Sequence, residues 1–225
     1  NMQSVMNSLF AKETLKPTKT NKNIFDIYEA LSDSKNESLR NKVEKSALQN
    51  GMLHIKDSSG TNIDVQIFDT EKIDFSKTDF DYQEKDLENK AVIFVMDYAF
   101  GEQAYETLDE LLKPIKVKGK KVHLDVRSIS IMGKAGILEG GKGDIMIPSA
   151  HIFEGTADNY PFTNELNKTD LLDCGVDVYE GTMITVLGTS LQNKEILKFF
   201  KKSTWNVIGL EMEGAHYQKA IHAAA

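Results

Sequence analysis

The sequence predicts an α/β protein with a mixed, mostly parallel central sheet flanked by helices. Two observations support this fold class. Short apolar runs alternate with amphipathic helical patterns from residue 91 onward, which is typical of parallel strands joined by crossover helices. The hydrophobic fraction of 40% over 225 residues is also enough for the core of such a domain. We therefore expect a helical extension over 1–50 and an α/β domain over 51–225.

The N-terminal extension is predicted from helical periodicity. Residues 1–23 are rich in Lys, Asn, Ser and Thr, and we expect a flexible start there. Apolar residues recur at helical spacing over 23–33, which predicts the first helix. A second helix is expected from residue 37, with Gly51 closing it.

The pattern then changes to strands. "MLHIKD" (52–57) and "TNIDVQIF" (61–68) flank "SSG", which predicts a β-hairpin. The polar residues 69–90 are expected to be a connection. Further strands are expected over 91–97, 121–133, 143–155, 181–190 and 205–213, and further helices over 101–115, 193–203 and 214–225.

Charge and cysteine content exclude several classes of protein. Acidic residues outnumber basic ones 34 to 27, for a formal charge of −7, which argues against a large nucleic-acid surface. The single cysteine, Cys174, excludes an internal disulfide and a cysteine-based zinc site. The five histidines show no metal-binding spacing, so no metal is expected. No transmembrane run or signal peptide is visible, so we expect a cytoplasmic protein with no membrane partner.

The stretch "GLEMEGAHY" places Glu211 and Glu213 where the last predicted strand gives way to a helix. Residues two apart point to the same face of a strand but diverge on a helix. Ligands of α/β proteins commonly bind at the carboxyl ends of strands. The two acids are therefore either solvated surface groups or part of a binding site.

Two further motifs carry a family resemblance. In "IMGKAGILEGGKGDIMIP" (131–148), a Gly-x-Ala-Gly loop follows an apolar run, and Gly143-Asp144 opens another. Followed by "EMEGA" (211–215), this order resembles the nucleoside phosphorylase and nucleosidase superfamily. That superfamily includes purine nucleoside phosphorylases, methylthioadenosine nucleosidases and AMP nucleosidases. "YAFGEQAYETL" (98–108) and "LGTSLQN" (187–193) also resemble its motifs, so the resemblance covers about 51–217.

The resemblance implies a phosphorylase/hydrolase-like three-layer fold, no cofactor and a homo-oligomer. It also implies an enzyme that cleaves the N-glycosidic bond of a purine nucleoside or nucleotide. Such a reaction passes through an oxocarbenium-like state that a carboxylate stabilises. By resemblance, Glu213 holds the ribose, Met212 packs against it, and Glu211 supports the junction or reaches the base.

The remaining site residues implied by the resemblance lie in loops. The loop of Gly133, Lys134, Ala135 and Gly136 would let backbone amides approach the nucleoside, and Leu191 would cover the purine. The loop glycines are equally compatible with a plain turn, and Lys134 with a solvated side chain.

Other polar residues near these motifs have simpler interpretations. Asp144 suits a structural turn acid. Arg127 suits either an ion pair or phosphate binding. His151 and His216 are expected to be structural or surface residues.

Three departures from the family pattern bear on the chemistry. Phosphorylases carry an arginine and a serine around the glycine loop, where this chain has Ile131 and Lys134, so hydrolysis is favoured over phosphorolysis. The family's first strand, with its phosphate-binding or general-base group, has no counterpart before residue 51. Its general-acid aspartate would follow the last helix, so we expect a further strand beyond Ala225. These departures keep open a non-catalytic nucleoside- or nucleotide-binding protein, as well as an unrelated α/β protein.

Overall fold

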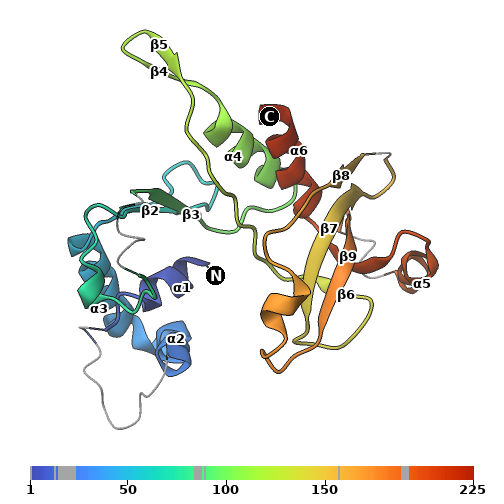
Figure 1. The fold of residues 1–225 in the computed structure, drawn as a ribbon, viewed down its shortest axis with the longest axis horizontal. Coiled ribbons are helices and arrows are strands. Elements are labelled where there is room, and N and C mark those ends of the chain that lie inside the picture. Colours follow the sequence, from blue (N-terminus) through green and yellow to red (C-terminus); the bar gives the residue numbers. More distant parts are fainter. Residues whose placement is uncertain are drawn as a thin grey trace. The chain divides into compact units, whose positions relative to one another are not determined.

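The computed structural model describes residues 2–12, 14, 24–83, 88, 90–156, 158–188 and 193–225. The chain divides into two compact units, Asn1–Tyr98 and Ala99–Ala225, whose elements are labelled in Figure 1. The expected boundary near residue 51 does not coincide with this division. The strands that follow residue 51 share a core with the N-terminal helices, so both belong to the first unit.

The first unit combines helices with a three-stranded antiparallel sheet of order β1-β2-β3. The predicted helices over 23–33 and from 37 are confirmed, as is the hairpin of β1 and β2. The elements are α1 (Met2–Ser8), α2 (Ile24–Ser32), η1 (Ser34–Asn36), α3 (Glu37–Gln49), β1 (Met52–Ile55), β2 (Val65–Asp69), η2 (Phe75–Lys77) and β3 (Val92–Met96).

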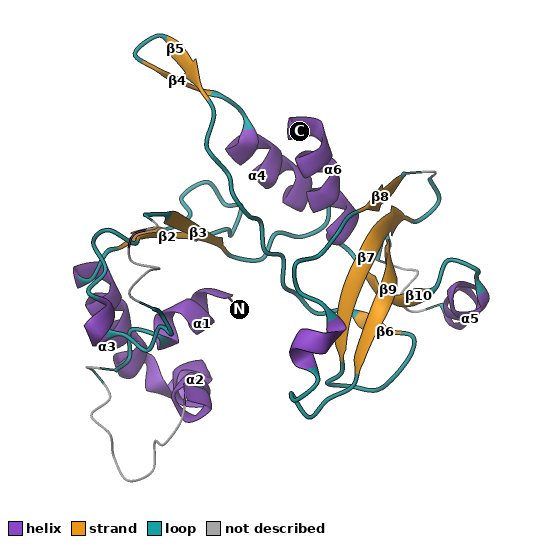
Figure 2. Cartoon of the chain, viewed as in Figure 1, coloured by secondary structure: helices purple, strands orange, loops and turns teal. Residues whose placement is uncertain are grey.

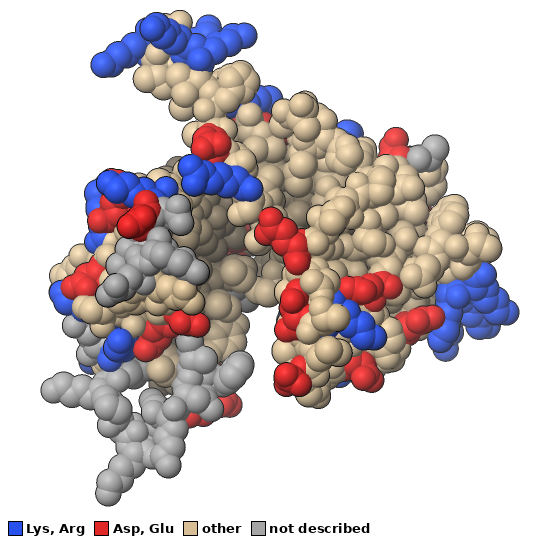
Figure 3. Space-filling view, in the orientation of Figure 1, with Lys and Arg blue, Asp and Glu red and all other residues tan. Residues whose placement is uncertain are grey.

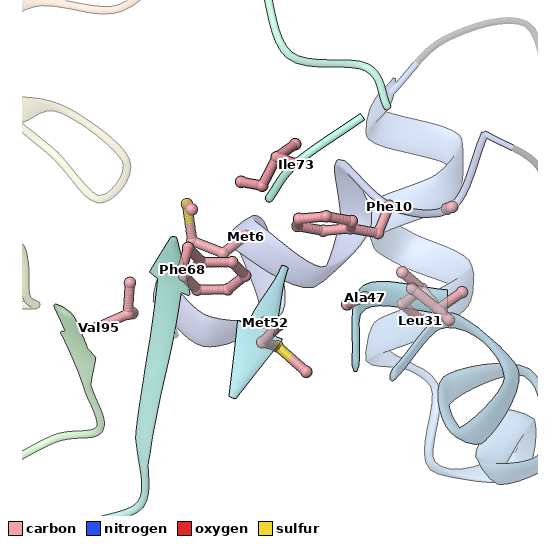
Figure 4. Packing of buried hydrophobic residues seen from close by; sticks show 10 residues of the cluster. Met6, Phe10, Leu31, Ala47, Met52, Phe68, Ile73 and Val95 are labelled. Carbon is pink, nitrogen blue, oxygen red and sulfur yellow. The ribbon is translucent and has the colours of Figure 1, made fainter. Parts of the chain in front are cut away.

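The core of the first unit lies between its helices and one face of this sheet (Figure 4). Phe10 stacks on Phe68 with ring centroids 5.6 Å apart, and both side chains are almost fully buried. Residues 2–12, expected as part of a flexible start, thus contribute Met6 and Phe10 to the core. Most of the remaining expected flexible start, residues 13 and 15–23, lies outside the described residues. The polar composition of this segment hides the few apolar residues that anchor it.

The second unit is built on a five-stranded sheet of order β6-β10-β9-β7-β8, and it also contains a separate β4-β5 hairpin (Figure 2). Its elements are α4 (Gln103–Leu112), β4 (Ile115–Val117), β5 (Lys120–Val122), β6 (Gly136–Ile137), β7 (Ile145–Phe153), β8 (Asn159–Pro161), η4 (Lys168–Leu171), β9 (Val178–Thr185), α5 (Lys194–Lys202), β10 (Val207–Glu211) and α6 (Gly214–Ala224).

The prediction of a mostly parallel central sheet is wrong. The described residues form six α-helices and ten strands, and the strands are distributed over three sheets. Among the strands of the described residues, only β7 with β9 and β9 with β10 pair in parallel. The edge strands β6 and β8 pair antiparallel, and the two smaller sheets are antiparallel throughout.

Two segments account for the difference. β3, expected as a buried parallel strand, pairs antiparallel with β2, and Val92 and Phe94 stay exposed. Of the strand expected over 121–133, only Lys121 and Val122 enter a sheet, as part of β5. Lys118 and Gly119 both have positive φ, as a two-residue hairpin turn requires. This turn directs the start of the segment into the hairpin.

The parallel strands of the second unit bring three chain segments to one edge of the sheet. Thr185, at the end of β9, is in register with both Phe153 of β7 and Glu211 of β10. α6 begins three residues after Glu211. The predicted junction of strand and helix is therefore confirmed, and it lies beside the carboxyl ends of two other strands. Within the described part of the chain, no helix is both long and apolar enough to cross a membrane.

Candidate functional site

Glu211 holds the first turn of α6 to the end of β10. One of its carboxylate oxygens, Oε2, accepts hydrogen bonds from the backbone N–H groups of Glu213, at 2.6 Å, and of Gly214. The first N–H groups of a helix have no partner within the helix. Glu211 satisfies two of them from outside the helix, and its side chain is only 10% exposed. The carboxylate also suits the positive end of the helix dipole.

Thr185 completes the same arrangement from the neighbouring strand. Its hydroxyl donates to Glu211 Oε1 and accepts the backbone N–H of Ala215 at 2.8 Å. Thr185 is fully buried, so both roles of the hydroxyl are fulfilled inside the protein. Three successive N–H groups at the start of α6 thus have acceptors, and β9, β10 and α6 are joined at one point.

His151 supports the carboxylate from the third strand, β7. Its Nδ1 lies 3.2 Å from Glu211 Oε1, and its ring stacks on Phe162 at 5.5 Å with only 5° between the planes. A proton on Nδ1 is needed to donate this hydrogen bond. The ring also lies directly over Gly214, where an added Cβ would come within 2.1 Å of Nδ1. The glycine after the second acid is therefore required by contact with His151.

The environment of Glu211 favours its ionised form. Burial alone would raise the pKa of this carboxyl group. Hydrogen bonds from His151, Thr185 and the Gly214 amide, together with the charge of His151, outweigh burial and lower the pKa. Glu211 is thus a buried structural carboxylate with its hydrogen-bonding capacity used within the protein.

Glu213 lies in a different environment two residues later. Its Oε1 accepts the backbone N–H of Gly101 at 3.0 Å, and the side chain makes no capping hydrogen bond to α6. Gly101 has φ +55°, a conformation that favours glycine. Burial raises the pKa of Glu213 above its ordinary 4.5, and the charge of Glu211 adds to the rise, against the Gly101 amide. The hydrogen bond from Gly101 therefore holds the Glu213 carboxylate in place, and no cation is among the groups that shift its pKa.

Two side chains near the start of α6 are uncharged near neutral pH, and one of them, Tyr217, interacts with Glu213. Burial and the nearby Glu213 charge raise the pKa of Tyr217, so its hydroxyl keeps its proton. Burial lowers the pKa of His216, whose ring meets Phe153 edge-on at 4.7 Å. Neither ring supplies a positive charge to Glu213 near neutral pH.

The structure brings together only part of the predicted site. Met212 is half-buried, and its Cε would lie 3.6 Å from a Cβ added at Gly188. Gly136 pairs with Leu210, next to Glu211 in the sequence. Gly133, Lys134 and Ala135 lie in an exposed irregular segment, and no contact places them at Glu213. Leu191 lies outside the described residues.

The contacts of Arg127 and Asp144 agree with an ion pair and a structural turn acid, respectively. Arg127 pairs with Asp125 on the surface at 3.4 Å, and Asp144 accepts the Gly141 N–H at 2.7 Å. Sequence analysis did not identify Thr185 and gave His151 no partner. The available signal was a polar residue within each of two predicted apolar strands, 143–155 for His151 and 181–190 for Thr185. No group of three or more acidic, His or Cys side chains in the described segments is arranged to hold a metal ion.

Comparison with known proteins places the chain in a family. The model of a family of unknown function, DUF6909, matches residues 9–225, which include nearly all of both units. The chain belongs to this family. No curated protein matches the chain. The description of DUF6909 names no activity, so the resemblance to the nucleosidases and the activity it implies stay predictions.

Replacing Gly214 with alanine should destabilise the second unit. Alanine normally stabilises a helix relative to glycine by about 1 kcal/mol. Here the methyl group would overlap the His151 ring, and overpacking of this kind costs about 1–3 kcal/mol. Urea denaturation at pH 7 would measure the loss. Gly133→Ala is the matched control, because a Cβ at Gly133 meets nothing within 4 Å. A Gly214→Ala protein as stable as the control would contradict the contact with His151.

The two acids should affect stability in opposite directions. Glu211 has a lowered pKa, so its contribution is present above pH 4.5 and is lost as pH falls through its folded pKa. Glu213 has a raised pKa, so stability declines as pH rises from 4.5 to its folded pKa. At pH 7, Glu211→Gln should therefore lose about 1–3 kcal/mol, as expected for hydrogen bonds to a buried charge. Glu213→Gln should be at least as stable as the parent.

Denaturation curves of both variants at pH 7 and pH 4 would check this prediction. Glu110→Gln is a suitable control, because Glu110 is an exposed acid on α4 whose side chain is 77% accessible. Equal losses in the two variants at pH 7 would show that the acids do not have separate roles.

Proposed function

We propose that the chain cleaves the N-glycosidic bond of a purine nucleoside or nucleotide, using water as the acceptor and Glu213 to hold the ribose. The observation that carries the proposal is the environment of Glu213. This half-buried carboxylate has a raised pKa and lies at the carboxyl end of a parallel strand. Carboxylates with perturbed pKa values at such sites are candidates for function.

The difference between the hydrogen-bond partners of Glu211 and those of Glu213 supports this assignment. Glu211 and Thr185 already satisfy the first N–H groups of α6, so the helix does not need Glu213 as a cap. The fold nevertheless keeps Glu213 partly buried, which disfavours its charge. A sugar with two hydroxyl groups would supply this half-buried carboxylate with hydrogen-bond donors in addition to the Gly101 amide.

Glu213 would act by electrostatic stabilisation of the charge that develops on the sugar. The bond between C1′ of the sugar and the ring nitrogen of the base breaks, and its electron pair leaves with the base. Positive charge develops on the sugar, and a carboxylate bound to the ribose hydroxyls stabilises it. Water then supplies a hydroxyl group to C1′ and a proton to the departing base, which balances the reaction as a hydrolysis.

Water is preferred to phosphate because the glycine loop carries little positive charge. Ile131 replaces the expected arginine and is 44% exposed, and Lys134 is the one cation of the loop 133–136, where its side chain is exposed. Lysine binds phosphate as a point charge without the fork of arginine. By the same resemblance, we propose that the active form is a homo-oligomer in the cytoplasm.

A panel of adenosine, inosine, methylthioadenosine and AMP tests the proposal, with base release measured by chromatography. We expect release from at least one compound, with a rate that added phosphate does not change. Glu213→Gln should lower the rate by about 100-fold, as removal of a transition-state contact does. The control Glu110→Gln should retain the parental rate.

The same experiment distinguishes the alternative function. Calorimetry on the panel would detect nucleoside binding without cleavage. Binding that requires Glu213, with no release of base, would identify a non-catalytic nucleoside-binding protein. If the protein binds no member of the panel and releases base from none of them, the proposal is overturned.

A further inference from the structure

A cavity of about 330 Å³ lies beside α5, near the carboxyl ends of β7 and β9. Its volume is at the lower end of the range of about 300–1,000 Å³ found for small-molecule sites. None of the expected site residues that the structure describes lines it. The lining residues are Phe153, Glu154, Gly155, Thr156, Ile184, Ile196, Phe199, Phe200 and Trp205.

The walls of this cavity are unusually aromatic. Three of the four aromatic rings come from α5 and the residues after it: Phe199, Phe200 and Trp205. Phe200 is buried, but Phe199 is 65% exposed and Trp205 is 50% exposed. An exposed phenylalanine and an exposed tryptophan at one cavity leave apolar surface in water. A flat apolar group placed between them would remove that surface from water.

We propose that this cavity binds the ring of a purine base. The aromatic walls favour a flat ring, because the faces of such rings stack on bases irrespective of base identity. Glu154 and Thr156 add oxygen acceptors to the lining, and the Glu154 carboxylate already accepts the Leu187 N–H at 3.2 Å. The amino group and ring N–H of a purine such as adenine are donors of matching chemistry. An aliphatic ligand has no donor to offer the Glu154 carboxylate, whose two oxygens can accept several hydrogen bonds.

The cavity and Glu213 share one edge of the sheet. Phe153 lines the cavity as the last residue of β7, and its ring also meets His216 in the first turn of α6 at 4.7 Å. Glu213 precedes that turn. The inference deepens the proposed function by assigning a place to the base. It does not depend on cleavage, because a free base needs only the cavity.

The protein contains a single tryptophan, and it lines the cavity. Titration of the full chain with free adenine, followed by tryptophan fluorescence, therefore reports on this cavity directly. We expect a saturable change in emission, and equilibrium dialysis should give the same dissociation constant. Phe199→Ala should weaken adenine binding at least about fivefold, the lower end of base-stacking effects. Phe94→Ala, which removes an exposed phenylalanine from β3 of the other unit, should leave it unchanged.

Three results would overturn the inference. One is the absence of saturable adenine binding in both measurements. Another is binding that Phe199→Ala does not weaken. The third is binding that leaves the fluorescence unchanged, which would place adenine elsewhere. Adenine binding retained in Glu213→Gln supports the inference. Adenine binding combined with no base release from any nucleoside would refute the proposed cleavage and leave the cavity assignment standing.

Discussion

The second unit depends on how the Glu211 carboxylate ends β10 and begins α6. A helix that starts against the edge of a sheet buries N–H groups that water cannot reach, and each unpaired group costs about 1–3 kcal/mol. Glu211 and Thr185 supply the acceptors, and His151 supplies the donor that keeps Glu211 ionised. One carboxylate thereby links three parallel strands to a helix. Gly214 is small because the His151 ring occupies the space above it.

This arrangement explains why two acids occur so close together. Their side chains diverge at the junction. Hydrogen-bond donors surround the Glu211 carboxylate, whereas the Glu213 carboxylate accepts the backbone N–H of Gly101. Identical chemical groups therefore acquire pKa values shifted in opposite directions. The first acid stabilises the fold, and the second is held at some cost to stability. Such a cost is commonly found where a group serves a ligand.

Local features of the fold were predictable from the sequence, and long-range ones were not. Helical spacing identified α2 and α3, and the turn at "SSG" identified the hairpin of β1 and β2. The junction at Glu211 followed from the change in periodicity. Apolar runs do not specify their partners, so β3 was assigned to the wrong sheet and residues 123–133 to a strand they do not form. The contact of His151 with Gly214 joins residues far apart in the sequence, and no local pattern encodes it.

Titration of the glutamate carboxyl carbons by NMR, with Glu211→Gln and Glu213→Gln used for assignment, tests the central claim most directly. The account predicts that Glu211 titrates below 4.5 and Glu213 above it in the folded protein. Two signals shifted in the same direction, or both unshifted, would contradict the separation of a structural acid from a ligand-binding one.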